Sequence, residues 1–280
     1  MNRYEKQNAA HRINDYYDLR PHEAALGKNV EAFERAKAEK VTIGNCELWH
    51  GDCREVLPLL PQADCVLTDP PYSQTTHDGA RGKGATTGGG HKLVDFEHLT
   101  EAEYPELLAL VAGKAKRWTL AFSDWPLAYI ARAAGLPLIR LGVWTKTDPA
   151  PQFTGDRPGT GWESILILHP EGRKRWNGGG RPAVWRTGIE KNGNVHPTQK
   201  PVQLMAALLA DFTDAGESVL DPFMGSGTTG VACAMHGRKF TGIERKRKYF
   251  DIAVERISRA QAQGQLIPHE MPKQVQESLV

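Results

Sequence analysis

Short apolar runs recur along the chain at a spacing that suits a sheet covered by helices. They lie at residues 46–49, 65–68, 118–122, 141–144, 164–168, 218–220 and 240–243. Helical patterns separate most of these runs, which predicts a mostly parallel sheet with helices on both faces. Ligands of such α/β proteins bind outside the carboxyl ends of the strands. Three acids, Asp69, Asp221 and Glu244, fall at that edge of the predicted sheet.

The first of these acids opens the segment Asp69-Pro70-Pro71-Tyr72. Its two prolines fix the backbone and remove two N–H donors, so the Pro70 carbonyl can accept a hydrogen bond beside the Asp69 carboxylate. These two acceptors can hold both hydrogens of one exocyclic NH2 group, while the Tyr72 ring offers a stacking face for a base. A plain strand-ending turn uses the same residue types, so these four residues alone leave both interpretations open.

The chemistry that this segment suits is reaction at a planar amine. The amine of adenine or cytosine is a poor nucleophile because its lone pair is conjugated into the ring. Hydrogen bonds from its N–H groups to Asp69 and Pro70 favour a pyramidal nitrogen with an available lone pair.

A second segment, residues 218–229, is a short apolar strand that runs into a glycine-rich turn and a predicted helix at 230–236. Gly225 and Gly227 would let the backbone approach a ligand, which the following N–H groups would face. Thr228 and Thr229 directly follow the second glycine, from which we expect NAD to be less favoured, although Gly230 completes the G-x-G-x-x-G spacing of the dinucleotide-binding pattern. The turn indicates a ligand that carries adenosine without a pyrophosphate.

A further strand, predicted to end at Glu244, places an acid about 20 residues after these glycines, the distance at which a carboxylate reaches a ribose diol. The alternative is a solvated acid in the charged run 244–248. Because the glycine turn is present, we predict that Glu244 binds ribose.

With these motifs the chain resembles the S-adenosylmethionine-dependent DNA amino-methyltransferases, which make N6-methyladenine or N4-methylcytosine. Residues 69–72 are similar to the catalytic motif of that family, residues 221–227 to its cofactor loop, and residues 194–201 to its cofactor-flanking segment. The catalytic motif precedes the cofactor loop, as in the beta class. The resemblance implies a Rossmann-like, circularly permuted fold with a mostly parallel seven-stranded sheet.

The resemblance also implies that S-adenosyl-L-methionine is the cofactor. Its binding residues would be Asp52, His196, Thr198, Lys200, Asp221, Phe223, Gly225, Ser226, Gly227, Thr228 and Glu244. Asp52 would face the adenine of the cofactor, although it equally suits a helix N-cap before Arg54.

The segment around His196 also contains residues with a structural purpose. Thr198 can cap a helix that Pro201 opens. Capping does not account for His196, Gln199 and Lys200, which by resemblance line the pocket for the methionine part of the cofactor.

Two polar segments are the candidates for DNA recognition. Residues 73–95 combine many glycines with Arg81 and Lys83, which predicts a mobile loop that orders over DNA; a simple surface loop is the alternative. Residues 171–195 place Trp176 and Trp185 among basic side chains, which suits phosphate contacts and stacking. Those basic residues are Arg173, Lys174, Arg175, Arg181 and Arg186.

Composition changes this picture little. The chain has 280 residues, 40% of them hydrophobic, and a formal net charge of +2, which suits one domain. We expect an N-terminal extension at 1–40, a catalytic domain at 41–262 and a tail at 263–280. The absence of a signal peptide or long apolar run favours a cytoplasmic protein with no membrane partner. Neither the four cysteines nor the histidines show metal-binding spacing, so we expect no metal and no disulfide.

The sequence thus predicts a site-specific enzyme that transfers a methyl group from S-adenosylmethionine to the N6 amine of a flipped-out adenine in double-stranded DNA. Tyr72 and Phe223 are the candidates to receive that base. Adenine is favoured because Asp at the first motif position resembles the adenine enzymes, whereas cytosine-N4 enzymes commonly have Ser. A cytosine-N4 enzyme and an inactive DNA-binding protein of the same fold are the alternatives, with RNA or protein methylation weaker. A homodimer and a companion restriction endonuclease stay open.

Overall fold

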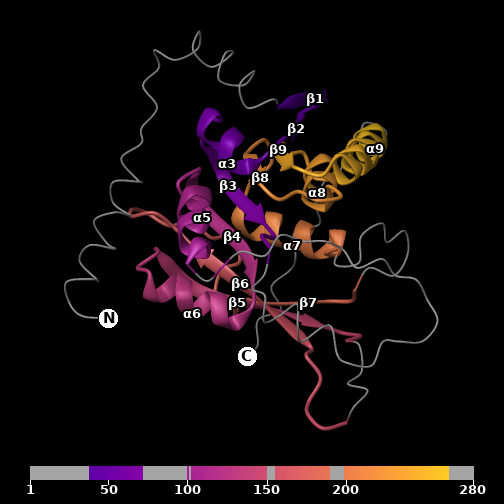
Figure 1. Ribbon diagram of the computed structural model, residues 1–280. Coiled ribbons are helices and arrows are strands. Elements are labelled where there is room, and N and C mark those ends of the chain that lie inside the picture. Colours follow the sequence, from indigo (N-terminus) through magenta and orange to yellow (C-terminus); the bar gives the residue numbers. More distant parts are fainter. Residues whose placement is uncertain (1–37, 72–99, 101, 150–154, 190–198, 265–280) are drawn as a thin grey trace.

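The computed structural model describes residues 38–71, 100, 102–149, 155–189 and 199–264 (Figure 1). The strands in these ranges are β1 (Glu39–Ile43), β2 (Cys46–His50), β3 (Ala63–Thr68), β4 (Ala115–Ser123), β5 (Leu138–Lys146), β6 (Trp162–Leu168), β7 (Val184–Thr187), β8 (Ser218–Asp221) and β9 (Lys239–Glu244). The helices are α3 (Cys53–Val56), the 3-10 helix η2 (Leu57–Leu59), α5 (Glu103–Ala112), α6 (Trp125–Ala133), α7 (Val202–Phe212), α8 (Thr228–Met235) and α9 (Arg247–Gly264).

The described strands form a nine-stranded sheet in the order β1-β2-β9-β8-β3-β4-β6-β5-β7. Neighbours from β2 to β4 run parallel, as do β5 and β7. β1 is antiparallel to β2, and β6 is antiparallel to both β4 and β5. The prediction of a mostly parallel sheet is confirmed. The expected count of seven strands is wrong, because β1 and β7 add one strand at each edge.

Helices cover both faces of the sheet, and each face has its own apolar core (Figure 1). On one face α7, α8 and α9 pack on the strands through side chains such as Leu204 and Ile257. On the other face α3, α5 and α6 pack through side chains such as Val56 and Leu108. Because the central strands are buried on both faces, they read in the sequence as continuous apolar runs.

The strand order brings distant parts of the chain together at the carboxyl ends of the parallel strands. β8 lies between β9 and β3, with Val66 of β3 paired to Leu220 of β8. Because β3, β8 and β9 run in the same direction, Asp69, Asp221 and Glu244 emerge together at their carboxyl ends. The early strand β3 and the late strands β8 and β9 are therefore neighbours, as the predicted circularly permuted order requires.

Several predicted segments lie outside the described residues. They are the N-terminal extension up to residue 37, the loop at 73–95 with Arg81 and Lys83, the stretch at 190–198, and the tail from residue 265. β1 begins at Glu39 and α9 ends at Gly264, two residues beyond each expected domain boundary. Among the helices that the structure describes, none has the length and apolar character needed to cross a membrane.

Candidate active site

A cavity of about 400 Å³ lies at the carboxyl ends of β2, β3, β8 and β9. Its lining contains Asp52, Asp69, Asp221 and Glu244, one acid from the end of each of these strands. A cavity of this size is typical of small-molecule sites. The structure thus brings together the three acids that the strand pattern placed at one edge and adds the fourth.

Asp69 follows β3 and meets a buried lysine. Lys200 Nζ lies 2.5 Å from Asp69 Oδ2 and 3.3 Å from Glu163 Oε2. The Lys200 side chain is only 7% exposed, and burial lowers its pKa, but the two carboxylates outweigh burial and leave the pKa raised. Lys200 is therefore a charged lysine held between two acids, one of which is the predicted catalytic group.

Glu163 is a site residue that the sequence did not reveal. It is the second residue of β6, and its Oε1 also lies 2.8 Å from Lys146 Nζ of β5. An acid at the start of an apolar strand is the one signal that could have found it. The resemblance had placed Lys200 beside the methionine part of the cofactor; the structure places it beside both the cavity and Asp69.

The rest of the predicted catalytic motif continues the cavity wall. Pro70 and Pro71 both line the cavity next to Asp69. Tyr72 lies outside the described residues, as do His196 and Thr198. The predicted cap of α7 by Thr198 is not tested, and α7 begins at Val202 directly after Pro201.

Asp221 ties the catalytic strand to the cofactor loop. Its carboxylate accepts hydrogen bonds from Thr68 Oγ1 and Thr229 Oγ1, both at 2.7 Å, and from the Phe223 backbone N–H at 3.1 Å. Burial raises the pKa of Asp221 to about 6, although these hydrogen bonds oppose the shift. A residue predicted as a cofactor ligand thus also joins β3, the loop after β8 and the first turn of α8.

The two predicted glycines of the loop have different reasons to be glycine. Both are left-handed, with φ of 52° at Gly225 and 81° at Gly227. A Cβ on Gly225 would have only Phe223 O nearby, at 4.0 Å, and Gly225 lines the cavity. A Cβ on Gly227 would lie 2.9 Å from Ala253 Cβ of α9. Gly225 therefore leaves space toward the cavity, whereas Gly227 is needed for its left-handed backbone and for the close approach of α9; its contact with the ligand stays a prediction.

An arginine of α9 fixes the same loop. Arg256 Nη1 donates to Ser226 O at 2.6 Å, Ser226 Oγ at 2.9 Å and Thr228 Oγ1 at 3.3 Å. Ser226 Oγ in turn donates to Gln199 Oε1 at 3.4 Å. The sequence offered no local signal for Arg256, which stands in an ordinary amphipathic helix.

Glu244 ends β9 with both carboxylate oxygens directed to backbone N–H groups. Oε2 accepts from Gly225 N at 3.1 Å, and Oε1 accepts from Lys246 N at 2.6 Å. Burial raises the pKa of Glu244, opposed by these hydrogen bonds and by the charges of Lys246 and Arg245. The alternative of a solvated acid is therefore wrong. Arg245 and Lys246, which follow Glu244, also line the cavity.

Both interpretations of Asp52 fit the structure. Asp52 is the N-cap of α3, with Oδ1 accepting from Arg54 N at 2.8 Å, and it also lines the cavity. Its contact with the cofactor adenine stays a prediction.

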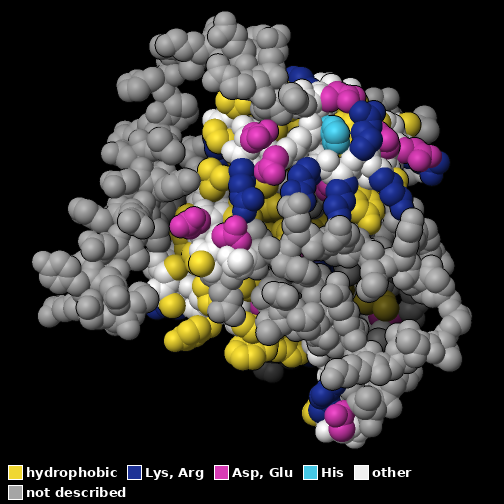
Figure 2. Space-filling model, in the orientation of Figure 1, with side chains coloured by type: hydrophobic (Ala, Val, Ile, Leu, Met, Phe, Trp, Pro, Cys, Tyr) yellow, Lys and Arg dark blue, Asp and Glu magenta, His cyan; other side chains and the backbone are white. Residues whose placement is uncertain are grey.

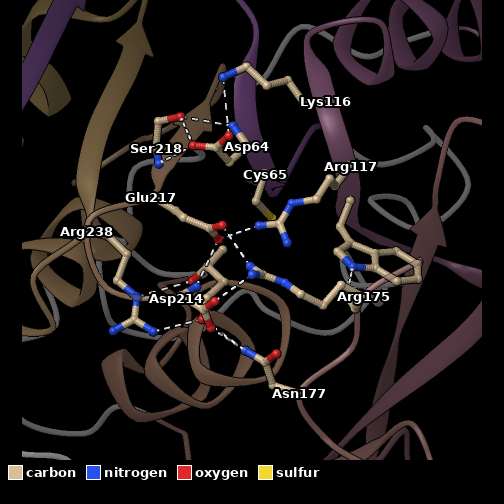
Figure 3. A network of polar contacts seen from close by, with 12 residues as sticks. Asp64, Cys65, Lys116, Arg117, Arg175, Asn177, Asp214, Glu217, Ser218 and Arg238 are labelled. Carbon is tan, nitrogen blue, oxygen red and sulfur yellow. Dashed lines mark hydrogen bonds and ion pairs between the residues drawn. The ribbon is translucent and has the colours of Figure 1, made fainter. Parts of the chain in front are cut away.

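The predicted DNA-recognition segment does not form one surface beside Asp69. Arg175 pairs with Asp214 at 2.6 Å and Glu217 at 2.7 Å, in a network at the amino ends of β3, β4 and β8 (Figure 3). That edge is opposite the cavity. Arg181 pairs with Asp211 of α7. Arg173 and Lys174 precede this network and are exposed.

Both tryptophans of this segment pack against the apolar core, Trp185 fully and Trp176 in part. Trp185 of β7 is buried in the core and donates to Asp211 Oδ2 at 2.9 Å. Trp176 packs its ring 5.0 Å from that of Phe212. Arg186 of β7 is exposed and pairs in the sheet with Thr145, close to the carboxyl-end edge. Of the five basic side chains predicted here, Arg186 lies best for a DNA contact.

Positive charge also gathers near the cavity. Figure 2 shows Lys and Arg side chains in a band across this face, between the regions of α3 and α9. Arg54, Arg245 and Lys246 line the cavity itself. Within the described residues, no group of three or more His, Cys, Asp or Glu is arranged to hold a metal ion, and Cys46, Cys53, Cys65 and Cys233 are free thiols.

Comparison with known proteins agrees with this site. The family model N6_N4_Mtase, described as DNA methylase, matches residues 63–255. The chain is 27% identical over 250 residues to the type II methyltransferase M.HinfI of Haemophilus influenzae, covering 74% of this chain and 67% of that protein. It is also similar to the crystal structure of an M1.HpyAVI–SAM complex, with 28% identity, a TM-score of 0.57, and coverage of 75% of this chain and 99% of that one.

A third similarity concerns the fold alone. The PvuII DNA methyltransferase, a cytosine-N4-specific enzyme by its description, superposes with a TM-score of 0.61 at 16% identity, covering 80% of this chain and 93% of that one.

The mostly parallel sheet is covered by helices on both faces, and the cavity at the carboxyl ends of its strands is lined by the glycine loop and Glu244, which is a Rossmann-like arrangement. The chain belongs to the N6_N4_Mtase family of DNA methylases, and it is a DNA amino-methyltransferase that uses S-adenosylmethionine. The cavity fits that cofactor, because Gly225 leaves space for it and Glu244 offers carboxylate acceptors beside apolar walls from Phe223 and Ile243.

Proposed function

We propose that this DNA amino-methyltransferase is site-specific and modifies the N6 amine of adenine in double-stranded DNA, with the target base turned out of the helix. The observation that carries the proposal is the position of Asp69. It stands in the cavity wall with Pro70 and is held by Lys200 at 2.5 Å. A carboxylate has about four acceptor positions, so one contact with an ammonium leaves capacity for an amine.

The residues around Asp69 suit nucleophilic attack by an exocyclic amine. S-adenosylmethionine, when bound, supplies an electrophilic methyl group. Asp69 and the Pro70 carbonyl accept the two amine hydrogens, which favours a pyramidal nitrogen with its lone pair available. The new N–C bond would replace the bond between the methyl group and the cofactor sulfur, so the amine nitrogen becomes positively charged and loses one proton. The Asp69 carboxylate is placed to accept that proton directly or through water. No covalent intermediate with the enzyme is required.

The remaining predicted site residues have complementary roles. Glu244 binds the ribose of the cofactor and Asp52 faces its adenine, as the resemblance implies. His196 and Thr198 contribute to the methionine end, while Tyr72 and Phe223 receive the target base. Arg186, the cavity-lining basic side chains, and Arg81 and Lys83 of the 73–95 segment contact DNA phosphates.

Adenine is preferred over cytosine for one reason, the aspartate at the first position of the motif. The same pair of acceptors could hold the N4 amine of cytosine, so the geometry of Asp69 and Pro70 supports amine methylation in general. The identity of the base therefore needs a direct measurement.

That measurement is nucleoside mass spectrometry of unmethylated DNA after incubation with the protein and S-adenosylmethionine. Asp69→Asn keeps the size of the side chain but replaces an acceptor by a donor, and we expect it to lose at least about 10²-fold in activity. Asp251→Asn is the matched control, because Asp251 forms an exposed ion pair with Arg247 on α9.

The outcomes separate the candidate functions. N6-methyladenine from the wild type and the control, but not from Asp69→Asn, supports the proposal. N4-methylcytosine would overturn the base assignment and keep the mechanism. No modified base, together with no thermal shift on adding S-adenosylmethionine, would instead favour a DNA-binding protein without activity.

A further inference from the structure

We infer that Lys200 and Glu163 are positioning residues for the catalytic carboxylate: Glu163 holds Lys200, and Lys200 orients Asp69 toward the amine. This inference rests on the proposed function of Asp69. It assigns Glu163 a part in the reaction, and it gives Lys200 a role different from the cofactor contact that the resemblance implies.

Four charged side chains of alternating sign form a continuous row of ion pairs. Lys146 Nζ lies 2.8 Å from Glu163 Oε1, Lys200 Nζ lies 3.3 Å from Glu163 Oε2, and Lys200 Nζ lies 2.5 Å from Asp69 Oδ2. The members come from β5, β6, the segment before α7, and the end of β3. Side chains from two other strands and from the segment before α7 therefore fix the position of the carboxylate at the end of β3.

Glu163 is needed because Lys200 is buried. An ammonium group taken out of water is costly unless carboxylates compensate it. With Asp69 alone, Lys200 would depend on the same carboxylate that has to bind substrate. Glu163 supplies a second negative charge, and Lys146 compensates Glu163 in turn. Asp69 is thereby oriented without being the sole partner of a buried cation.

The expected size of the effect follows from orientation. Misplacing a catalytic group by about 1 Å can cost on the order of 10²-fold in rate. Because Glu163 contacts Asp69 only through Lys200, its loss should lower kcat and leave the affinity for S-adenosylmethionine nearly unchanged. A lysine that binds the cofactor would show the opposite division, with weaker cofactor binding and a smaller change in kcat.

A pH profile gives a second readout that a merely structural residue would not change. The described groups around Lys200 are Asp69 and Glu163 at contact distance, the Phe122 ring of β4 at 4.9 Å, and Lys146 beyond Glu163. Asp221 adds a further charge near Asp69. Without Glu163, burial is opposed by Asp69 alone, and the pKa of Lys200 falls. The charged form of Lys200 is then lost at a lower pH, so an alkaline decline in activity should begin earlier.

The experiment compares Glu163→Gln and Lys200→Met with the wild type and with Glu47→Gln. Glu47 is a matched control, since it pairs with Lys40 on an exposed part of the sheet. We expect kcat to fall about 10- to 100-fold in Glu163→Gln and further in Lys200→Met, with the Kd for S-adenosylmethionine changed less than about 3-fold. The alkaline limb of Glu163→Gln should move to lower pH than that of the wild type and of Glu47→Gln. Lys200→Arg, which keeps the charge, should recover part of the lost kcat.

Three results would overturn the inference. One is a Glu163→Gln enzyme whose kcat and pH profile match those of Glu47→Gln. Another is a Lys200→Met enzyme with weakened cofactor binding and preserved kcat at saturation, which would make Lys200 a cofactor ligand. The third is failure of Lys200→Arg to exceed Lys200→Met. If Glu163→Gln does not fold, Glu163→Asp replaces it, because aspartate keeps the charge with a shorter side chain. Its kcat and its alkaline limb should change in the same direction as expected for Glu163→Gln, but by less. Absence of any modified base from the wild type would instead reject the proposed function of Asp69.

Discussion

The sheet has one side where its parallel strands begin, the amino-end edge, and one where they end, the carboxyl-end edge. Both carry networks of charged side chains, yet they differ in what surrounds the charges. At the amino ends of the strands, Arg175, Asp214 and Glu217 tie loops together on a partly exposed surface (Figure 3). At the carboxyl ends, Lys200 is buried and the acids line a cavity. The number of charges is therefore a poor guide to function, and burial beside an open cavity is a better one.

This difference also separates two kinds of energetic role. An exposed network stabilises the fold modestly and tolerates the loss of a member. A buried charge beside a cavity is costly to the fold and is retained where it serves binding or chemistry. Variants at each edge can test this division. Loss of a charge at the amino ends should lower stability and leave activity intact, whereas loss of a buried charge at the carboxyl ends should relieve a cost to stability or alter ligand binding and activity.

The largest expected effect is on stability at Asp221, at the carboxyl-end edge. Burial raises its pKa in the folded state to about 6, above the usual 3.8, so the folded state holds the proton more tightly and loses stability as pH rises through that window. Asp221→Asn removes this penalty. The difference in unfolding free energy between variant and wild type should therefore move in favour of the variant by roughly 3 kcal/mol between about pH 4 and pH 7.

Urea unfolding of both proteins across that pH range measures the effect of Asp221→Asn. A difference that is flat with pH would show that Asp221 titrates as an ordinary exposed acid. Thr68→Val serves as a comparison, because it removes one hydrogen bond to Asp221 and keeps the carboxylate.

The next effect concerns cofactor binding at Glu244. A hydrogen bond to a charged group contributes about 1.5–3 kcal/mol, so Glu244→Ala should raise the Kd for S-adenosylmethionine on the order of 10- to 100-fold. Isothermal titration calorimetry measures this change. Glu244→Gln is the conservative partner, since its amide oxygen can still accept from Gly225 N. An unchanged Kd in Glu244→Ala would reject the ribose-binding role.

At the amino-end edge, Glu217→Gln should change stability and leave catalysis intact. Glu217 accepts from Arg117, from Arg175 at 2.7 Å and from the Asp214 N–H at 2.9 Å. Loss of its charge should cost about 1–2 kcal/mol of unfolding free energy, with kcat within about 2-fold of the wild type. Arg259→Gln, which breaks an exposed pair with Glu255, is a control with a smaller effect. A large fall in kcat for Glu217→Gln would contradict the division between the two edges.

The smallest effect is on DNA binding. Each phosphate contact contributes about one unit to the slope of log K against log salt concentration. Arg186→Gln should reduce the slope by about one, because Arg186 is exposed near the carboxyl-end edge. Arg175→Gln should leave the slope unchanged, since its guanidinium is engaged by acids at the far edge. The reverse ranking would restore the predicted DNA role of Arg175.

Much of the fold could be predicted because the central strands are buried on both faces. All seven predicted strands are present, since short uninterrupted apolar runs such as those of β4 and β8 are typical of strands covered by helices on both sides. The two missed strands lie at the edges. β1 is largely exposed, and β7 has only four residues of alternating burial inside a basic segment, so neither produces an apolar run.

The candidate site could be predicted where it follows from strand ends and not where it depends on tertiary contacts. Asp69, Asp221 and Glu244 meet because the carboxyl ends of parallel strands share an edge. The contact of Lys200 with Glu163 joins two distant segments, and a buried acid and an exposed one look alike in a sequence. The stacking role predicted for Trp185 is wrong for the same reason, because an indole suits an apolar core as well as a stacking surface.

The place of β8 between β9 and β3 has a consequence for the synthesis of the protein. A ribosome completes β3 and Asp69, the proposed catalytic residue, long before β8 and β9 emerge. Until then the β3 edge that later pairs with β8 has no strand beside it, and it resembles the unpaired edges that chaperones protect. A chain that ends before β8 therefore carries Asp69 without the glycine loop and the acid that complete the cavity lining.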